Sequence, residues 1–327
     1  MVPMNSATPK AVVTDWTFPD LSVENEILTR NNLSLLGKQC KTESELMELV
    51  ADANAVLTQF ARISEKVIGA MKHARAIVRY GIGVDNVNLE AARARGIPVC
   101  NVPGYCIDEV ADQTLAFILA STRQVVPNST HLTQGKWGLP VPIASMNALR
   151  DLTVGVVGFG RIGREVVRRL VGFRCRVLVF DPLIAPDQIN NASVEGAKSF
   201  EQLLTRCDVI TLHCPSTPQT RRMFNAEAFK KLKYGALLIN VARGDLIESQ
   251  ALVSALQSGQ LAGAALDVFD PEPIPTDHPI RKMPNVILSA HIASVSPSAA
   301  KTLRETAANL AVKAIRGENL PNVVNGV

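Results

Sequence analysis

The amino-acid sequence predicts an α/β protein built on a doubly wound parallel sheet, accompanied by a second domain. The chain has 327 residues, more than a single domain of about 150 residues accounts for. Short apolar runs alternate with helical patterns along most of the chain. The apolar runs are not interrupted by polar residues, which is typical of parallel strands covered by helices on both faces.

The first third of the chain contains four apolar runs with helical patterns between them. We expect helices at Glu43–Asp52 and at Asn88–Arg95, the second of which is closed by Gly96. The expected strands are Ala11–Asp15, Ala55–Gln59, Ala76–Tyr80 and Val99–Val102.

A long helix and a long loop are expected next. The helix covers about Ile107 to Arg123, and Asp108 and Glu109 lie in its first turn, where the helix macrodipole favours negative charge. Gly135–Arg150 is rich in proline and glycine and has no clear periodicity, so we expect an extended loop there.

A second alternating series begins at Leu152, and its six strands predict a doubly wound, dinucleotide-binding architecture. The expected strands are Thr153–Val157, Arg176–Phe180, Val209–Cys214, Leu237–Val241, Gly263–Val268 and Val286–Ser289. The expected helices are Ile162–Val171, Phe200–Thr205, Ala226–Lys231, Ser249–Gln257 and, in the tail, Ala299–Ile315.

Composition and charge exclude several classes of protein. Hydrophobic residues make up 47% and charged residues 20% of the chain, which is ordinary globular usage. The net charge is only +4, and no run of Lys and Arg forms a basic arm, so we expect no nucleic-acid partner. The stretch Met283–Ala300 has no formal charge, but it contains two prolines, a histidine and four serines, so we expect no membrane span.

The cysteines and the N-terminus favour a cytoplasmic protein. Six cysteines are scattered without any CxxC pair, which fits neither a disulfide framework nor a zinc site, so we expect reduced thiols and no metal. The N-terminus, MVPMNSATPK, lacks the order of a signal peptide.

The strongest local motif is a glycine-rich turn that contains Gly158, Gly160 and Gly163. This turn follows the apolar run LTVGVV and opens the helical run REVVRRL. Asp181 stands eighteen residues after Gly163, at the end of the next strand. Such glycines allow a pyrophosphate to approach a helix N-terminus closely. The carboxylate of Asp181 suits the ribose hydroxyls of NAD and repels the 2′-phosphate of NADP. We therefore predict NAD as the cofactor, over the alternative of a purely structural turn.

Three later patches each end a predicted strand and carry Arg243, Asp267 with Glu272, and His291. The carboxyl ends of strands in an open parallel sheet face the ligand crevice. Arginine binds carboxylates bidentately, histidine exchanges a hydroxyl proton near neutral pH, and a glutamate orients that histidine and raises its pKa. Each residue alone also has a structural interpretation, as a cap, a surface charge or a satisfied histidine. Their joint placement after the glycine turn favours oxidation of a hydroxy acid.

The sequence resembles the D-isomer-specific 2-hydroxyacid dehydrogenases over nearly its whole length. The motifs that carry the likeness are RYGIGVDN, GFGRIGREV with FDP, HCPSTPQT, LLINVARGDLIE, GAALDVFDPEP and LSAHIAS. The resemblance implies catalytic roles for Arg243, Glu272 and His291. It implies substrate contacts by Arg79 and by the amides of Ile82 and Gly83. The cofactor positions that it implies are Gly158, Gly160, Arg161, Ile162, Gly163, Asp181, Cys214, Val241, Ala242, Asp267 and Ser294.

The resemblance also implies how the chain is divided. Residues 1–101 with 294–327 would form a discontinuous, flavodoxin-like substrate domain, and residues 102–293 would form the NAD-binding Rossmann domain. The helix from about Ile107 and the loop Gly135–Arg150 would form a homodimer contact. Within the family, the chain is most similar to the 3-phosphoglycerate dehydrogenase and C-terminal-binding-protein branches, in a short form without a regulatory domain. Ser294 and Val295 stand where the second branch carries an aromatic pair.

Other functions remain open from the sequence. A protein that senses NAD and recruits a partner would not need the Arg, Glu and His set. Formate relatives carry glutamine at the position of Glu272, which disfavours formate, and phosphite is not distinguished by these motifs. The 2-hydroxy acid itself is left open among 3-phosphoglycerate, glycerate with hydroxypyruvate, glycolate with glyoxylate, and a larger sugar acid.

Overall fold

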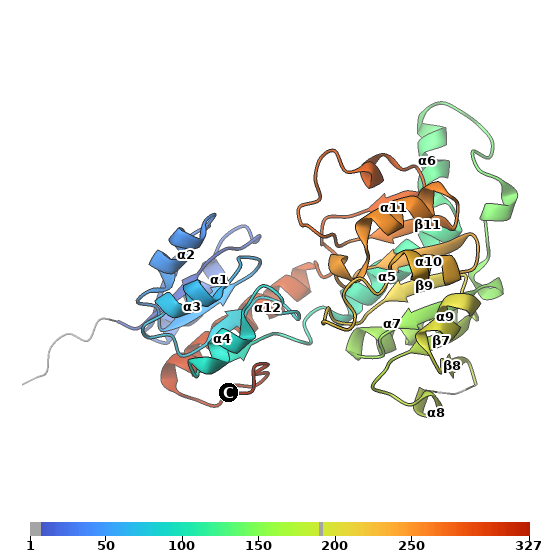
Figure 1. Ribbon diagram of the computed structural model, residues 1–327. Coiled ribbons are helices and arrows are strands. Elements are labelled where there is room, and N and C mark those ends of the chain that lie inside the picture. The colour runs from blue at the N-terminus through green and yellow to red at the C-terminus, as the bar shows by residue number, and fades with distance from the viewer. Residues whose placement is uncertain (1–7, 190–191) are drawn as a thin grey trace, which may run out of the picture. The chain divides into compact units, whose positions relative to one another are not determined.

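The computed structural model describes residues 8–189 and 192–327, which form two compact units (Figure 1). The first unit contains residues 8–105 together with 296–327, and the second contains the described residues from 106 to 295. Each unit is built on its own parallel sheet.

The described residues of the first unit form a five-stranded sheet in the order β2-β1-β3-β4-β5, in which all neighbours are parallel. Its strands are β1 (Lys10–Val13), β2 (Ser34–Gly37), β3 (Ala55–Thr58), β4 (Ile77–Arg79) and β5 (Val99–Cys100). The strand order reverses between β1 and β3, which makes this a doubly wound sheet with a topological switch point at that place.

Helices cover both faces of this sheet. They are α1 (Ser22–Arg30), α2 (Glu43–Val50), α3 (Glu65–Ala70), α4 (Leu89–Ala94) and α12 (Pro297–Arg316). Ala11 and Val13 belong to the cluster that includes Leu303 of α12, whereas Val12 between them packs with Val50 of α2. Helix α12 lies beside α1 although the two are far apart in the sequence (Figure 1). Successive strand residues therefore face two different cores, which explains the uninterrupted apolar runs.

The described residues of the second unit form a seven-stranded parallel sheet in the order β12-β11-β10-β9-β6-β7-β8. Its strands are β6 (Thr153–Val157), β7 (Arg176–Phe180), β8 (Val194–Gly196), β9 (Val209–Leu212), β10 (Ala236–Asn240), β11 (Leu261–Leu266) and β12 (Val286–Leu288). The switch point lies between β6 and β9. The predicted doubly wound α/β fold is confirmed.

The helices of the second unit also cover two faces of its sheet (Figure 1). They are α5 (Ile107–Thr122), α6 (Val125–Thr133), α7 (Arg161–Gly172), α8 (Pro186–Ile189), α9 (Phe200–Arg206), α10 (Ala226–Lys231) and α11 (Ser249–Gln257). Helices α9, α10 and α11 share one apolar cluster with the strands, for example through Leu203, Phe229 and Leu252. On α7, Arg169 binds Asp108 and Asp112 of α5, which fixes these two helices to each other.

Several short elements were not expected from the sequence. Strands β2 and β8 have four and three residues at the edges of their sheets, and β2 is mostly exposed, so neither carries a long apolar run. Helix α6 contains no buried residue. A helix that buries no face does not need the periodic apolar residues by which helices are predicted from sequence. The expected loop Gly135–Arg150 is irregular apart from the 3₁₀ turn Ile143–Ser145 and the start of a second turn, Leu149–Asp151.

No helix within the described part of the chain combines the length and the apolar character needed to cross a membrane.

Candidate active site

The glycine-rich turn between β6 and α7 requires glycine for a steric reason at two positions. Gly158 has a φ of 97°, and a Cβ there would lie 2.7 Å from the backbone carbonyl of His213. A Cβ at Gly163 would lie 2.1 Å from the carbonyl oxygen of Gly158. Gly160, by contrast, has open space where a Cβ would stand, and it precedes the first turn of α7 without any side-chain cap. The turn thus leaves room and uncapped amides at Arg161 and Ile162, which fits a dinucleotide pyrophosphate.

Asp181 follows β7 and lies beside this turn. Its Oδ2 accepts a hydrogen bond of 2.8 Å from the amide of Phe159, and its Oδ1 accepts one of 2.9 Å from the amide of Leu183. The carboxylate is therefore held at the switch-point end of the sheet, with lone pairs left for ribose hydroxyls. The other predicted cofactor positions also follow strands of this edge: Cys214 comes after β9, Val241 and Ala242 after β10, and Ser294 after β12. Burial raises the pKa of the Cys214 thiol to about 11, so this group stays protonated at neutral pH.

Arg243 follows β10 and is positioned by backbone contacts on both sides. The buried side chain of Asn240 accepts a hydrogen bond from the amide of Ala242 and donates one of 2.8 Å to the carbonyl of Arg243. A Cβ at Gly244 would lie 2.0 Å from the carbonyl carbon of Phe269. The segments that carry Arg243 and Glu272 therefore run against each other without an intervening side chain. Sequence reasoning missed Asn240 and Gly244, although a polar residue ending a buried strand and a glycine after the arginine are visible signals.

Glu272 and His291 form a hydrogen-bonded pair. Oε2 of Glu272 lies 2.8 Å from Nδ1 of His291, and Oε1 accepts a hydrogen bond of 2.8 Å from the amide of Phe269. Burial alone would raise the pKa of Glu272, but the hydrogen bond and charge of His291, with a further contribution from Arg243, hold it below its usual value. The glutamate is therefore ionised at neutral pH, and its Oε2 orients the imidazole through Nδ1.

Asp267 is fully buried at the end of β11 and supports the segment that carries His291. Its Oδ1 accepts from the amide of Ile292 and from the hydroxyl of Ser289, and its Oδ2 accepts from the amide of Ala293. His291 itself has a φ of 55°, a left-handed conformation that costs energy for most residues. The hydrogen bonds of Asp267 offset this cost. A contact between Asp267 and the cofactor stays a prediction.

The predicted substrate residues lie in the first unit, at the end of β4. Arg79 is 9% exposed, and its guanidinium packs directly on Gly81, where a Cβ would lie 1.4 Å from Nη1. Gly81 has a φ of 146°, so both its conformation and the packing of Arg79 depend on glycine. The loop is held further by Asn101, whose side-chain amide donates a hydrogen bond of 2.6 Å from Nδ2 to the backbone carbonyl of Ile82.

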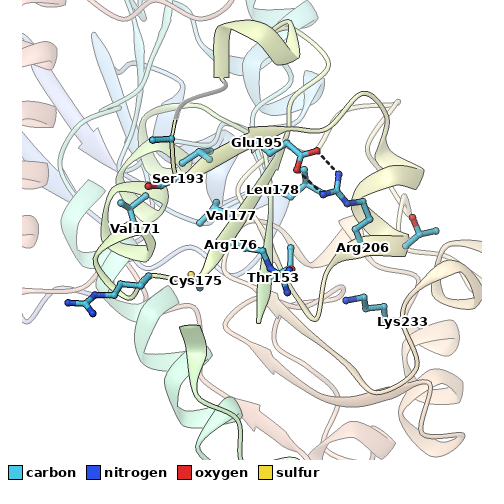
Figure 2. Close-up of a pocket in the computed structure, with 14 residues that line it drawn as sticks. Thr153, Val171, Cys175, Arg176, Val177, Leu178, Ser193, Glu195, Arg206 and Lys233 are labelled. Carbon is cyan, nitrogen blue, oxygen red and sulfur yellow. Dashed lines mark hydrogen bonds and ion pairs between the residues drawn. The ribbon is translucent and has the colours of Figure 1, made fainter. Parts of the chain in front are cut away.

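A separate hollow of about 720 Å³ lies at the opposite, amino-terminal edge of the seven-stranded sheet (Figure 2). Thr153, Arg176 and Val194 line it from the beginnings of β6, β7 and β8. Two of its cations are already paired, because Arg206 binds Glu195 and Lys233 binds Asp208. Because the hollow lies at the amino-terminal edge of the sheet and His291 follows the carboxyl end of a strand, the hollow is not the candidate active site.

One edge of the seven-stranded sheet carries a glycine turn that fits a dinucleotide, and also an ionised carboxylate, an imidazole and an arginine. These groups are typical of the active site of an NAD-dependent dehydrogenase. Residues 115–293 match the model of the D-isomer specific 2-hydroxyacid dehydrogenase family, NAD binding domain. The glyoxylate reductase of Korarchaeum cryptofilum is 36% identical over 284 residues, which cover 86% of this chain and 85% of that protein. The D-3-phosphoglycerate dehydrogenase of Methanocaldococcus jannaschii is 35% identical over 87% of this chain and 54% of its own length.

A solved structure supports the same assignment. The D-lactate dehydrogenase of Aquifex aeolicus, complexed with NAD and lactic acid, superposes with a TM-score of 0.87 at 26% identity, over 97% of this chain and 99% of that one. The chain belongs to the D-isomer specific 2-hydroxyacid dehydrogenase family. It is an enzyme that uses NAD and acts on CH–OH donors.

The choice of NAD over NADP is expected to depend on Asp181. A like charge beside the 2′-phosphate costs several kcal/mol, so Asp181→Ala should raise the ratio of kcat/KM for NADPH to that for NADH by about tenfold or more. Asp181→Asn is a second, more conservative variant: it removes the charge but keeps one acceptor oxygen for the amide of Phe159 or of Leu183, and it should change the ratio in the same direction. Initial rates with both cofactors measure the ratio. Equal use of the two cofactors by the unmutated enzyme would contradict this role of Asp181.

Proposed function

We propose that the enzyme reduces a small 2-keto acid to the D-2-hydroxy acid, with His291 as acid/base, Glu272 as its partner and Arg243 as the anchor of the substrate. The single observation that carries the proposal is the hydrogen bond of 2.8 Å between Glu272 and His291, at the sheet edge that also holds Arg243. The substrates considered are glyoxylate, hydroxypyruvate and the oxidised form of 3-phosphoglycerate. The relatives named glyoxylate reductase and D-3-phosphoglycerate dehydrogenase support this range.

The proton is moved by His291 in this mechanism. Nδ1 is engaged by Glu272, so we assign proton transfer to Nε2. In the reduction, protonated His291 gives its proton to the carbonyl oxygen of the substrate. NADH, when bound at the glycine-rich turn, would supply the hydride that the carbonyl carbon accepts. Ionised Glu272 favours the imidazolium form that this step requires. In the oxidation, the neutral imidazole removes the hydroxyl proton.

The substrate is held by its carboxylate. The guanidinium of Arg243 binds the carboxylate and the neighbouring carbonyl oxygen, so that positive charge stands where negative charge develops. We further propose that Arg79 and the amides of Ile82 and Gly83 bind the carboxylate. Accordingly, the first unit is the substrate domain, and the second unit, with the cofactor positions from Gly158 to Ser294, is the NAD-binding domain.

The experiment that tests the proposed function follows NADH oxidation with glyoxylate, pyruvate, hydroxypyruvate and simple aldehydes as substrates. We expect turnover of the keto acids and no turnover of the simple aldehydes. The products of pyruvate and hydroxypyruvate, which unlike glycolate are chiral, should have the D configuration. Formate and phosphite, tested with NAD, should give no reduction. Turnover of formate or phosphite without turnover of any keto acid would overturn the proposal.

We also propose that the enzyme is a homodimer and is cytoplasmic. Large apolar side chains are exposed on α6 and on the segment after it, including Leu132, Trp137 and Ile143, the last two being 92% and 76% exposed. Exposed apolar groups that gather in one segment mark protein interfaces. The six cysteines are scattered along the sequence without a CxxC pair, which favours a reducing compartment.

Disrupting this segment should separate the dimer. Ile143→Asp places a charge among the apolar side chains, and we expect light scattering to report half the mass of the unmutated protein. Tyr234→Asp, at an exposed position in another loop, is the control and should retain the dimer mass. A wild-type protein that has the mass of one chain would contradict the dimer.

A further inference from the structure

A buried ion pair in the first unit joins two helices behind the strand end that carries Arg79. Glu24 lies on α1 and Arg304 on α12, and both side chains are buried, Glu24 completely. Nε of Arg304 donates hydrogen bonds of 3.0 and 3.2 Å to the two carboxylate oxygens of Glu24, and Nη2 donates one of 2.7 Å to Oε2. Nη2 also donates to the backbone carbonyl of Asp20, at 2.8 Å. A planar guanidinium held in this way fixes the direction of the carboxylate as well as its distance.

The carboxylate of Glu24 in turn holds Tyr80, the residue that directly follows β4. The Tyr80 side chain is 1% exposed, and its hydroxyl donates a hydrogen bond of 3.3 Å to Oε1 of Glu24. Burial and the charge of Glu24 raise the pKa of Tyr80 well above its usual value, so the hydroxyl keeps its proton and remains a donor. Phe18 completes the cluster, because its ring centre lies 5.4 Å from that of Tyr80, edge to face, and 5.1 Å from the guanidinium carbon of Arg304.

Tyr80 and Arg79 are neighbours at the end of one strand, so fixing the first orients the second. Tyr80 packs in the same core as Val78, whereas Ile77 packs in the core on the other face of the sheet. Because successive side chains of a strand alternate between the two faces, Arg79 belongs to the face of Ile77. A turn of the backbone that released the Tyr80 ring would therefore swing Arg79 as well.

A contribution to stability is not a sufficient reason for this ion pair. Taking two charges out of water costs about as much as their attraction returns, so apolar residues of similar volume often serve a core equally well. The ion pair adds direction instead, because the Tyr80 hydroxyl meets its acceptor in one position of the ring. This property suits a group that must hold a neighbouring side chain in place.

We propose that the buried pair of Glu24 and Arg304 acts through Tyr80 to position Arg79 for binding the carboxylate of the substrate. This inference rests on the proposed function, in which Arg79 contacts the substrate. Glu24, Tyr80 and Arg304 are positioning residues, since they act through Arg79 and not on the substrate itself. Losing their contacts should therefore weaken substrate binding and leave cofactor binding and the chemical step unchanged.

The first test is Tyr80→Phe, which removes the hydroxyl and keeps the ring. We expect KM for glyoxylate to rise about threefold to tenfold, the range of one hydrogen bond, while kcat and the dissociation constant of NADH stay within about twofold. Tyr234→Phe is the control, because it removes a hydroxyl from an exposed ring of the other unit, and it should keep the wild-type KM. An unchanged KM in Tyr80→Phe contradicts the inference and leaves the proposed function intact. An unmutated enzyme that turns over no keto acid overturns the proposed function, and this inference with it.

A second test shows whether Tyr80 acts through Arg79. Arg79→Met alone should raise KM for glyoxylate by about tenfold or more, the loss expected for hydrogen bonds to a charged group. In the Arg79→Met background, Tyr80→Phe should raise KM no further, because the group that Tyr80 positions is gone. A rise of KM by the same factor in both backgrounds would show that Tyr80 does not act through Arg79.

Replacing Glu24 and Arg304 together by methionine separates positioning from stability. Methionine fills the space without charge, so we expect thermal unfolding at or above the wild-type temperature. KM for glyoxylate should still rise about threefold or more, because the Tyr80 hydroxyl has lost its acceptor. The matched control replaces Lys301 and Glu305, an exposed ion pair of the same helix, by methionine and should keep the wild-type KM. A wild-type KM in the first double variant would show that the buried pair is purely structural, and if that variant does not fold, Tyr80→Phe decides alone.

Discussion

Replacing His291 with asparagine is expected to lower kcat by about 10²–10⁴-fold in both directions and at every pH, which is the loss typical of a missing general acid/base. Asparagine is the informative replacement because the residue adopts a φ of 55°, and asparagine tolerates this left-handed conformation better than most residues. The hydrogen bonds of Asp267 to the amides of Ile292 and Ala293 do not involve the side chain at 291. The backbone of the segment should therefore be retained.

NADH binding, followed by its fluorescence, should be nearly the same in His291→Asn as in the unmutated enzyme. This control separates a loss of proton transfer from a loss of cofactor binding. An activity of His291→Asn within about threefold of the wild type, far from the loss expected for a general acid/base, would remove His291 from the mechanism.

Replacing Arg243 with lysine is expected to lower kcat/KM by about 10²-fold or more, a loss of about 2.7 kcal/mol of transition-state stabilisation. Lysine keeps the positive charge but not the planar fork that binds a carboxylate and a carbonyl oxygen together. The contacts of Asn240 with this segment are made to backbone atoms, so the loop should keep its conformation. The effect should therefore be confined to substrate binding and turnover.

Arg206→Lys is the matched control for this variant. Arg206 is paired with Glu195 at the amino-terminal edge of the same sheet, so its replacement should leave kcat/KM unchanged. Wild-type kinetics in Arg243→Lys would show that Arg243 does not hold the substrate.

The architecture could be predicted from the sequence because its main signals are local. The glycine turn, the following helix and the uninterrupted strands all lie within short windows, and the doubly wound fold followed from their alternation. Strands β2 and β8 escaped prediction because each is a short edge strand, and β2 is exposed, so their pairing depends on neighbours in space.

The candidate site could be predicted only in part. Glu272 and His291 were expected at one sheet edge because both follow parallel strands, and the structure brings them within 2.8 Å. The contacts of Asn240 are local, because they join it to Ala242 and Arg243. The role of Gly244, by contrast, depends on the close approach of its segment to Phe269, and only the structure shows this approach. Tertiary contacts of this kind are visible only once the fold is known.

Ionised Glu272 is expected to tune His291 for proton transfer, and the pair of pH–rate profiles of Glu272→Gln tests this role most directly. The hydrogen bond and charge of His291 lower the pKa of Glu272, and a carboxylate beside an imidazole in general favours the imidazolium form. Glutamine keeps an acceptor for the amide of Phe269 but has no charge, so the imidazolium should lose its proton at lower pH. Reduction needs the protonated form and oxidation the neutral form. We therefore expect the alkaline limb of reduction and the acid limb of oxidation both to move to lower pH. If both limbs stay at their wild-type positions and only the plateau falls, Glu272 does not tune His291, and the two residues do not act as an acid/base pair.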